Sequence, residues 1–99
     1  MKNYEVALII KPSLTDSELK SFILNLEKFI QNDSKGKILE KEDWGRRKFS
    51  YRIKKEDMGY YYFLNFSLEA EALAKFDKKL RLDNNILRYI VSNVYTQQS

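Results

Sequence analysis

The sequence lacks two residue types that carry much of enzyme chemistry, because none of its 99 residues is a cysteine or a histidine. Without cysteine there is no disulfide, thiolate metal site or cysteine nucleophile. Without histidine the usual general base and zinc ligand are missing. A P-loop and a dinucleotide-binding motif are absent, and no two carboxylates share an obvious apolar setting that would separate their pKa values. We therefore expect no cofactor, no metal and no catalytic activity.

Long apolar runs are also missing. None approaches the roughly 20 residues that span a bilayer, so we expect no membrane partner. The composition, 43% hydrophobic and 32% charged, is typical of a globular domain. We expect a single domain over residues 1–94, followed by a short polar tail over residues 95–99. The net charge of +4 favours an anionic partner such as nucleic acid or an acidic protein.

With one proline and three glycines, the chain offers few turn signals, and hydrophobic periodicity has to define its elements. Thr15 and Glu18 have the spacing of a capping box at a helix start. Gly45 indicates a bulge within a long strand, and residues 56–59 are predicted to form the turn after it. The predicted elements are strands over 3–10, 38–55, 60–68 and 86–94, and helices over 15–33 and 69–82.

This β-α-β-β-α-β order predicts an α+β, ferredoxin-like fold. Two right-handed split crossovers place both helices on one face of a four-stranded antiparallel sheet with strand order 4-1-3-2. Acylphosphatase-like enzymes share this topology, but they need a glycine-rich phosphate loop with an arginine after the first strand. Residues 11–18 read KPSLTDSE and have neither. The strand over 38–55 becomes an edge strand, and the second sheet face stays open.

The edge strand contains the segment GRRKFSYRIKK, in which cations alternate with apolar residues. We expect Phe49, Tyr51 and Ile53 to face the helices. The opposite parity, which we expect to face outward, contains the cations Arg46, Lys48, Arg52 and Lys54. Such a row has a second explanation, because edge strands often carry charges that prevent edge-to-edge aggregation. Nearby acidic residues offer a third, since they could pair with the cations.

The open face is predicted to expose Tyr61 and Phe63 on the third strand and Ile90 on the last strand. Aromatic rings beside cations can stack bases and neutralise phosphates. Exposed apolar area beside charge can equally mark a protein interface. The segment MGYYYFLNF weakly resembles the third-strand signature of the RNA recognition motif, but it lacks the basic residue before the glycine.

Three segments together resemble the family of bacterial-type small ribosomal subunit protein six: YEVALIIKPSL, WGRRKFSYRIKKEDMGYYYF and LRLDNNILRYIV. The middle segment is similar to the family pattern Gly-x-Arg-x-Leu-x-Tyr-x-Ile-x-Lys. Gly45, Arg47, Tyr51 and Ile53 match defined positions of this pattern, Phe49 stands where it has leucine, and Lys54 and Lys55 follow Ile53. The chain departs from the family in having Arg52 where proline is frequent, and Asn93 where a basic residue is frequent.

The resemblance implies a structural role in the ribosome, with two partners: the central domain of small-subunit ribosomal RNA and small-subunit protein eighteen. By matching position, Lys2, Tyr4 and Arg88 would lie toward RNA. Our reading of the charge pattern adds Arg46, Arg47, Lys54 and Lys55 as RNA-binding candidates. Tyr61, Phe63 and Ile90 would meet the protein partner.

The implied location is the ribosome of a bacterial cytoplasm or of an organelle, and we expect a monomer in isolation. The alternative function is a ferredoxin-like protein-interaction or regulatory module that uses its open sheet face.

Overall fold

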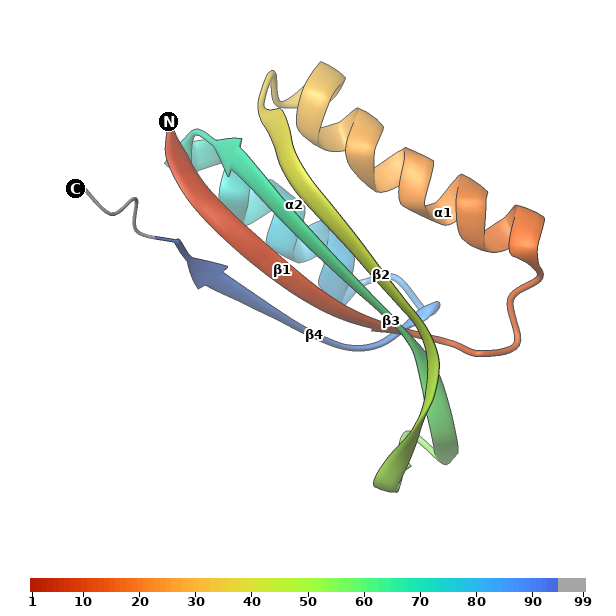
Figure 1. Ribbon diagram of the computed structural model, residues 1–99. Coiled ribbons are helices and arrows are strands. Elements are labelled where there is room, and N and C mark those ends of the chain that lie inside the picture. The colour runs from red at the N-terminus through yellow and green to blue at the C-terminus, as the bar shows by residue number, and fades with distance from the viewer. Residues whose placement is uncertain (95–99) are drawn as a thin grey trace.

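Strands and helices follow one another in the predicted order in the computed structural model, which describes residues 1–94 (Figure 1). The predicted tail, 95–99, lies outside the described residues. The elements are β1 (Lys2–Ile10), α1 (Asp16–Lys28), the π-helical turn η1 (Phe29–Asp33), β2 (Lys37–Ile53), β3 (Glu56–Leu68), α2 (Ala70–Arg81) and β4 (Ile86–Asn93).

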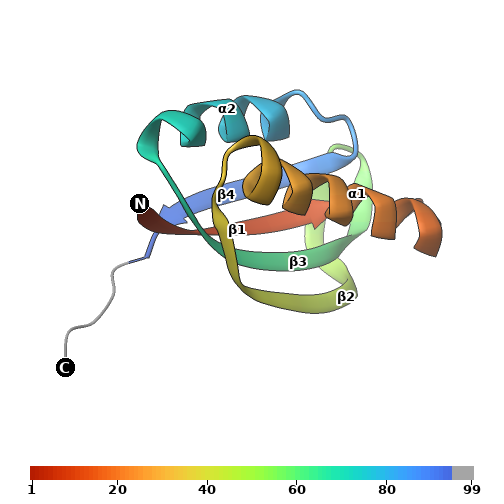
Figure 2. The same ribbon diagram turned by 90° about the horizontal axis from the view of Figure 1, so that it is seen from above.

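The sheet has the order β2-β3-β1-β4, with every neighbouring pair antiparallel. Read from the other edge this is 4-1-3-2, so the predicted ferredoxin-like arrangement is confirmed. Figure 2 shows α1 and α2 together above one face of the sheet. The opposite face carries no helix among residues 1–94, and β2 is an edge strand.

The core lies between the sheet and the two helices, where alternate strand residues meet the apolar sides of the helices. Val6, Leu8, Leu64 and Phe66 are at most 1% exposed, and Phe76 of α2 is fully buried. The Phe66 ring lies 5.8 Å from that of Tyr4 and 5.0 Å from that of Phe76. Each such side chain removed from water stabilises the fold by about 1.5–3 kcal/mol.

The start of α1 is fixed by the predicted capping box. The Glu18 amide donates to Thr15 Oγ1 at 3.2 Å, and the Thr15 amide donates to Glu18 Oε1 at 2.8 Å. The two hydrogen bonds satisfy donors that have no partner within the helix. The hydrogen bonds from Thr15, the backbone one foremost, lower the pKa of Glu18 below its ordinary value of 4.5.

Because the pKa of Glu18 is lowered, its contribution to the stability of the fold depends on pH. A carboxylate with a depressed folded-state pKa stabilises the fold above its ordinary pKa, and the stabilisation is lost as pH falls through the folded-state value. We expect Glu18→Gln to lower stability at pH 7, and the difference from wild type to shrink toward pH 3. Urea denaturation at both pH values measures it. Glu71→Gln, in the first turn of α2 but outside a capping box, is the control and should show a smaller change.

The hairpin between β2 and β3 differs from the prediction. The turn lies at Lys54 and Lys55, whose φ angles are 49° and 69°, and not at residues 56–59. Two consecutive residues with positive φ form the type I′ turn that suits a two-residue hairpin. Gly59 instead lies within β3, opposite Arg47. A Cβ there would lie 2.6 Å from Ile9 Cγ2 and 2.7 Å from Phe49 Cζ, so this glycine makes room for close packing.

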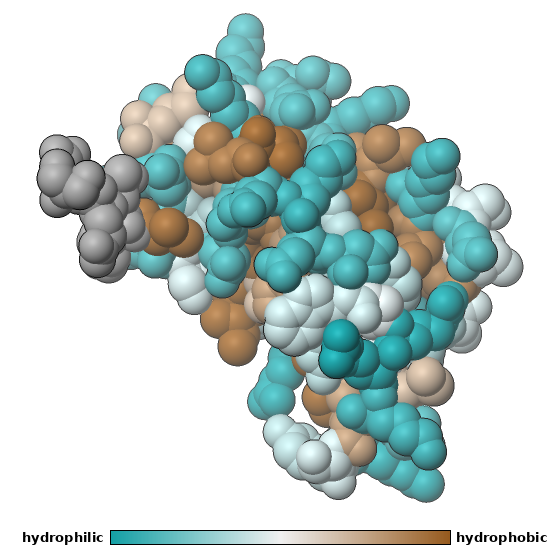
Figure 3. All heavy atoms as spheres, in the orientation of Figure 1, coloured by the Kyte–Doolittle hydropathy of each residue, from teal (hydrophilic) through white to brown (hydrophobic). Residues whose placement is uncertain are grey.

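Residues 46–59 form what we call the hairpin arm. Ile10, at the end of β1, pairs with Tyr60, so β3 residues before Tyr60 pair only with β2. Figure 1 shows this end of the hairpin reaching past the rest of the sheet at the bottom of the view. In the same orientation, hydrophilic side chains cover much of the right-hand side of the arm (Figure 3).

Candidate functional site

The faces of β2 are set by irregularities in its pairing with β3. The register shifts between Ile38 and Glu40 and again between Asp43 and Gly45, which leaves Leu39 and Trp44 as extra residues. The second shift is the predicted bulge, and Gly45 takes a φ of 75° there. Each inserted residue exchanges the two faces for every residue that follows. The side on which the cationic row lies therefore depends on these bulges.

Arg46 and Lys48 lie on the helix side of the sheet, because they pair with Tyr60 and Met58. The expectation that they face the open side was wrong. Phe49 was expected on the helix side, but its ring lies 6.1 Å from that of Tyr61 on the open side. Tyr51, also expected to face the helices, is 67% exposed. The two inserted residues cancel, so Arg46 and Lys48 lie on the same side as Ile38, which pairs with the core residue Phe66.

Arg46 links β2 to the loop between β1 and α1 through hydrogen bonds. Its Nε donates to the Pro12 carbonyl at 3.2 Å, and its Nη2 donates to the Leu14 carbonyl at 2.9 Å. The guanidinium carbon lies 5.6 Å from the centroid of the Tyr60 ring. The Tyr60 hydroxyl donates to Asp43 Oδ2. Burial, then this hydrogen bond and the Asp43 charge, raises the pKa of Tyr60 to about 12.

We expect Arg46→Met to cost about 1 kcal/mol of unfolding free energy, because it removes two exposed hydrogen bonds to carbonyls. Lys48→Met is the matched control, since Lys48 lies on the same side of β2 but its side chain forms no hydrogen bond within residues 1–94. Urea denaturation of both variants measures the difference. Equal losses would mean that the hydrogen bonds of Arg46 do not stabilise the loop.

The open face carries an apolar band that runs across all four strands. One row of the sheet aligns Phe63 with Ala7 and Ile90, and the next aligns Tyr61 with Ile9 and Arg88. Trp44 packs on Phe63 with a centroid distance of 4.6 Å. Trp44 is 44% exposed and Ile90 is 61% exposed. The apolar band consists of Ala7, Ile9, Trp44, Phe49, Tyr61, Phe63 and Ile90.

The predicted partner-facing residues Tyr61, Phe63 and Ile90 therefore share one surface. Trp44 and Phe49 belong to it as well, and sequence reasoning missed both. The signal that could have found Phe49 is Gly59, whose missing side chain leaves space for the Phe49 ring on the open side. No comparable signal indicates the position of Trp44, because it occupies a bulge.

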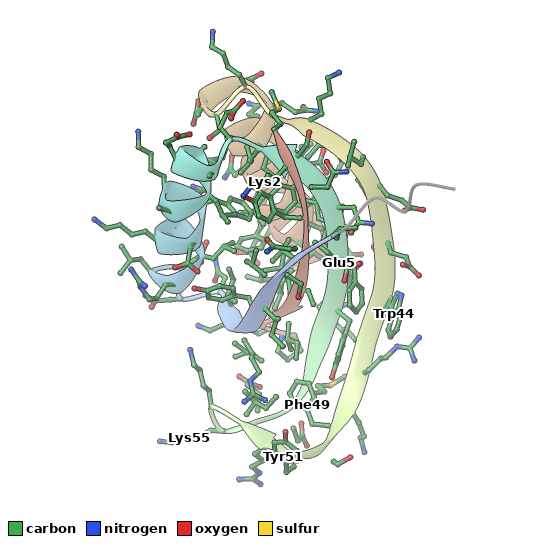
Figure 4. All side chains as sticks on the ribbon, turned by 90° about the vertical axis from the view of Figure 1, so that its left-hand side faces the viewer. Lys2, Glu5, Trp44, Phe49, Tyr51 and Lys55 are labelled. Atoms are coloured by element: carbon green, nitrogen blue, oxygen red, sulfur yellow. The ribbon has the colours of Figure 1, made fainter. Side chains whose placement is uncertain are left out.

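Carboxylates gather on the open face beside this band, and we call Glu5, Glu40 and Glu42 the acidic end. They line a shallow hollow with Lys41, Phe63 and Asn65, and Figure 4 shows Glu5 and Trp44 toward the same side of the sheet. Asn65 donates to Glu40 Oε2 at 3.5 Å. Its Oδ1 is buried and accepts no hydrogen bond from residues 1–94. The open face thus combines apolar area, negative charge and a spare acceptor.

The predicted RNA-binding residues do not form one cluster. Lys54 and Lys55 lie in the turn of the hairpin arm, whereas Lys2 pairs with Leu68 at the opposite end of the sheet (Figure 4). Arg88 lies on the open face beside Ile9. Tyr4 is only 3% exposed, and its ring packs in the core.

Positive charge is concentrated in the hairpin arm. The arm contains six basic and two acidic residues, a net charge of +4 that equals the formal net charge of the whole chain. The remaining residues carry equal numbers of each sign. Within residues 1–94, none of the six cations forms an ion pair with a carboxylate; the ion pairs there are Met1–Glu69, Lys41–Glu27 and Arg81–Asp77. The acidic neighbours therefore do not neutralise the arm through contacts.

The described part of the chain, residues 1–94, offers neither a cluster of metal-ligating side chains nor a membrane-spanning helix. No group of three or more acidic side chains there is arranged to hold a metal ion. No helix there is long and apolar enough to cross a membrane.

Fold and surfaces together define a small ferredoxin-like α+β protein with a cationic arm and an apolar sheet face. Residues 3–93 match the model of the family described as Ribosomal protein S6. The chain belongs to this family, and it is a structural component of the small ribosomal subunit. The family expectation drawn from the three sequence segments is confirmed.

Individual relatives agree along most of the chain. Small ribosomal subunit protein bS6 of Geotalea daltonii is 38% identical over 89 residues, which cover 90% of this chain and 69% of that protein. The bS6 protein of Carboxydothermus hydrogenoformans is 34% identical over 91 residues, 92% of this chain and 94% of that protein. These bacterial relatives place the chain in the ribosome of a bacterial cytoplasm, the first of the two predicted locations.

A solved structure has the same fold as this chain. The crystal structure of 30S ribosomal protein S6 from Thermotoga maritima matches with a TM-score of 0.88 and 30% sequence identity. The match covers 94% of this chain and 87% of that one.

Proposed function

We propose that this protein binds the central domain of small-subunit ribosomal RNA together with small-subunit ribosomal protein eighteen, as a non-catalytic contact between the two. The observation that carries the proposal is the presence of two surfaces of different character on one small fold, which meet at Arg47, Trp44 and Phe49. The hairpin arm holds a net charge of +4 with no ion-paired cation within residues 1–94. The open face holds an apolar band beside the acidic end.

RNA is assigned to the arm because phosphates are bound mainly through lysine and arginine charges that release counterions. Lys54 and Lys55 meet this requirement best, since they are exposed in the turn of the arm. Arg47 is exposed as well, but its Nε donates to the Trp44 carbonyl at 3.4 Å and its guanidinium carbon lies 5.1 Å from the centroid of the Trp44 ring. Lys2 and Arg88 are proposed as additional contacts away from the arm. Arg46 is partly committed to the loop carbonyls, and buried Tyr4 would support the strand end without offering its ring to RNA.

The protein partner is assigned to the open face because its apolar band would be covered in a complex. The acidic end favours a partner segment that carries a basic side chain. Such a side chain, or another donor of the partner, would also supply the hydrogen bond that Asn65 Oδ1 lacks. Electrostatic complementarity of this kind contributes to specificity and to the rate of association.

The apolar band also supports the second candidate, an interaction or regulatory module that docks other proteins on its open sheet face. That function needs no RNA and leaves the arm as edge protection. Cofractionation separates the two candidates, since a ribosomal component sediments with small subunits and a free module does not.

Binding to a central-domain fragment of small-subunit ribosomal RNA, with and without protein eighteen, tests the proposal. Trp44 is the only tryptophan of the chain and lies in the apolar band, so its emission reports docking of the partner. We expect the partner to change this emission, and the pair to bind RNA with an affinity that falls with salt. The salt slope counts phosphates at about 0.7–0.9 per contact. No specific RNA binding in either arrangement would contradict the proposal.

A further inference from the structure

The hairpin arm carries an exposed aromatic ring that the fold does not use. Tyr51 is 67% exposed, and within residues 1–94 its side chain forms no hydrogen bond and no ring contact. Figure 4 shows Tyr51 at the end of the arm, away from the helices and beyond Phe49. A tyrosine with this exposure adds little to stability through burial.

The local strand pairing explains why the side chain of Tyr51 is exposed. Lys48 pairs with Met58 and Ile53 pairs with Glu56, so four residues of β2 stand opposite Asp57 alone. Phe49, within this irregular stretch, packs against Tyr61 and beside Gly59. Phe49 is therefore the aromatic residue of the arm that packs against the sheet, and the ring of Tyr51 stays exposed to solvent.

The surroundings of Tyr51 are cationic. Arg52 is its neighbour in sequence, Lys48 precedes the irregular stretch, and Lys54 and Lys55 form the turn. All four are exposed and none has an ion-pair partner in the described chain. An aromatic face among free cations meets both requirements for an unpaired nucleotide, namely a surface for the base and charges for the phosphates.

We propose that Tyr51 is a base-stacking residue: an unpaired base of the RNA stacks on its ring while Arg52, Lys54 and Lys55 bind the flanking phosphates. This inference rests on the proposed RNA binding, and it adds the contact residue and the conformation of the RNA at the arm. A protein partner fits this spot less well, because the apolar band that would accompany a buried tyrosine lies on the open sheet face and the arm is dominated by charge.

Four variants test the proposal in complexes of the full chain with protein eighteen and the central-domain RNA fragment. Tyr51→Phe keeps the stacking ring, whereas Tyr51→Leu and Tyr51→Ala remove it. Leu82→Ala is the matched control, because Leu82 is also 67% exposed but lies outside the arm. We expect Tyr51→Leu and Tyr51→Ala to bind RNA about 5- to 150-fold more weakly, the range for loss of one stacked base. Tyr51→Phe and Leu82→Ala should bind like wild type.

The salt dependence separates stacking from charge. Loss of a neutral ring should leave the salt slope unchanged while it lowers affinity at every salt concentration. If wild type binds RNA and Tyr51→Ala binds equally well, the inference fails and the proposed function stands. If Tyr51→Ala weakens docking of protein eighteen, read by Trp44 emission without RNA, Tyr51 belongs to the protein interface and the inference is overturned. If wild type binds no RNA, both proposals fall.

Discussion

Phe66→Ala is expected to lower the free energy of unfolding by about 3–5 kcal/mol, the range for removing a buried aromatic ring from a packed core. Phe66 is fully buried on the central strand β3, between the rings of Tyr4 and Phe76. Domains of this kind are stable by only about 5–15 kcal/mol, so the variant loses a large part of its stability. Urea denaturation and thermal melting measure the loss.

Phe63→Ala is the matched control, because Phe63 lies three residues earlier on the same strand but on the open face. It is only partly buried, and its ring contact within residues 1–94 is with Trp44. We expect this variant to lose much less stability, about 1 kcal/mol or less. A loss as large as that of Phe66→Ala would contradict the two-faced sheet and would mean that the open face is packed like the core.

The contrast between these two phenylalanines could be predicted from sequence, because β1, β3 and β4 keep one register where they pair from Tyr4 to Ile9. Strict alternation then places Val6, Leu64 and Phe66 in the core and Phe63 outside, as the burial of these residues confirms. Element order, both helices, the capping box and the edge position of β2 followed from the same local patterns. These features depend on neighbours within a few residues or on the handedness of crossovers.

β2 could not be read in this way, because its faces depend on bulges that are set by packing against β3. One bulge was indicated by Gly45, but its effect on the faces of the following residues, from Arg46 onward, was not. The turn was misplaced for a related reason. Glycine is common in turns, but Gly59 lies within β3 and allows close packing there. Lys54 and Lys55 form the turn instead, and they adopt positive φ angles although asparagine or glycine is usual at such positions.

Removing the free charges of the arm is expected to have the largest effect on RNA binding. The variant combines Lys48→Gln, Arg52→Gln, Lys54→Asn and Lys55→Gly. Asparagine and glycine are the preferred pair for a type I′ turn, so the arm should keep its shape while its charge falls. If each of the four cations meets one phosphate, the salt slope should fall by about three and the affinity at about 0.1 M salt by about a thousandfold.

A second variant with the same net charge distinguishes local contacts from overall attraction. Lys20, Lys28, Lys75 and Lys78 are exposed lysines on the helices, and their replacement by glutamine also removes four charges. We expect this helix variant to bind RNA within a few-fold of wild type, because charges beyond roughly 10 Å are screened at about 0.1 M salt. Equal losses in the two variants would contradict a binding role specific to the arm.

The arm variant also addresses the competing explanation of the cationic row. Charges on an edge strand can keep sheets of separate molecules apart, and β2 is such an edge. If protection is their role, the arm variant should associate as its concentration rises, as measured by sedimentation, while the monomer that remains binds RNA with an unchanged salt slope. If RNA binding is their role, the slope must fall even where the variant stays monomeric. The two roles thus predict different outcomes for one protein, and the salt slope of the monomer decides between them.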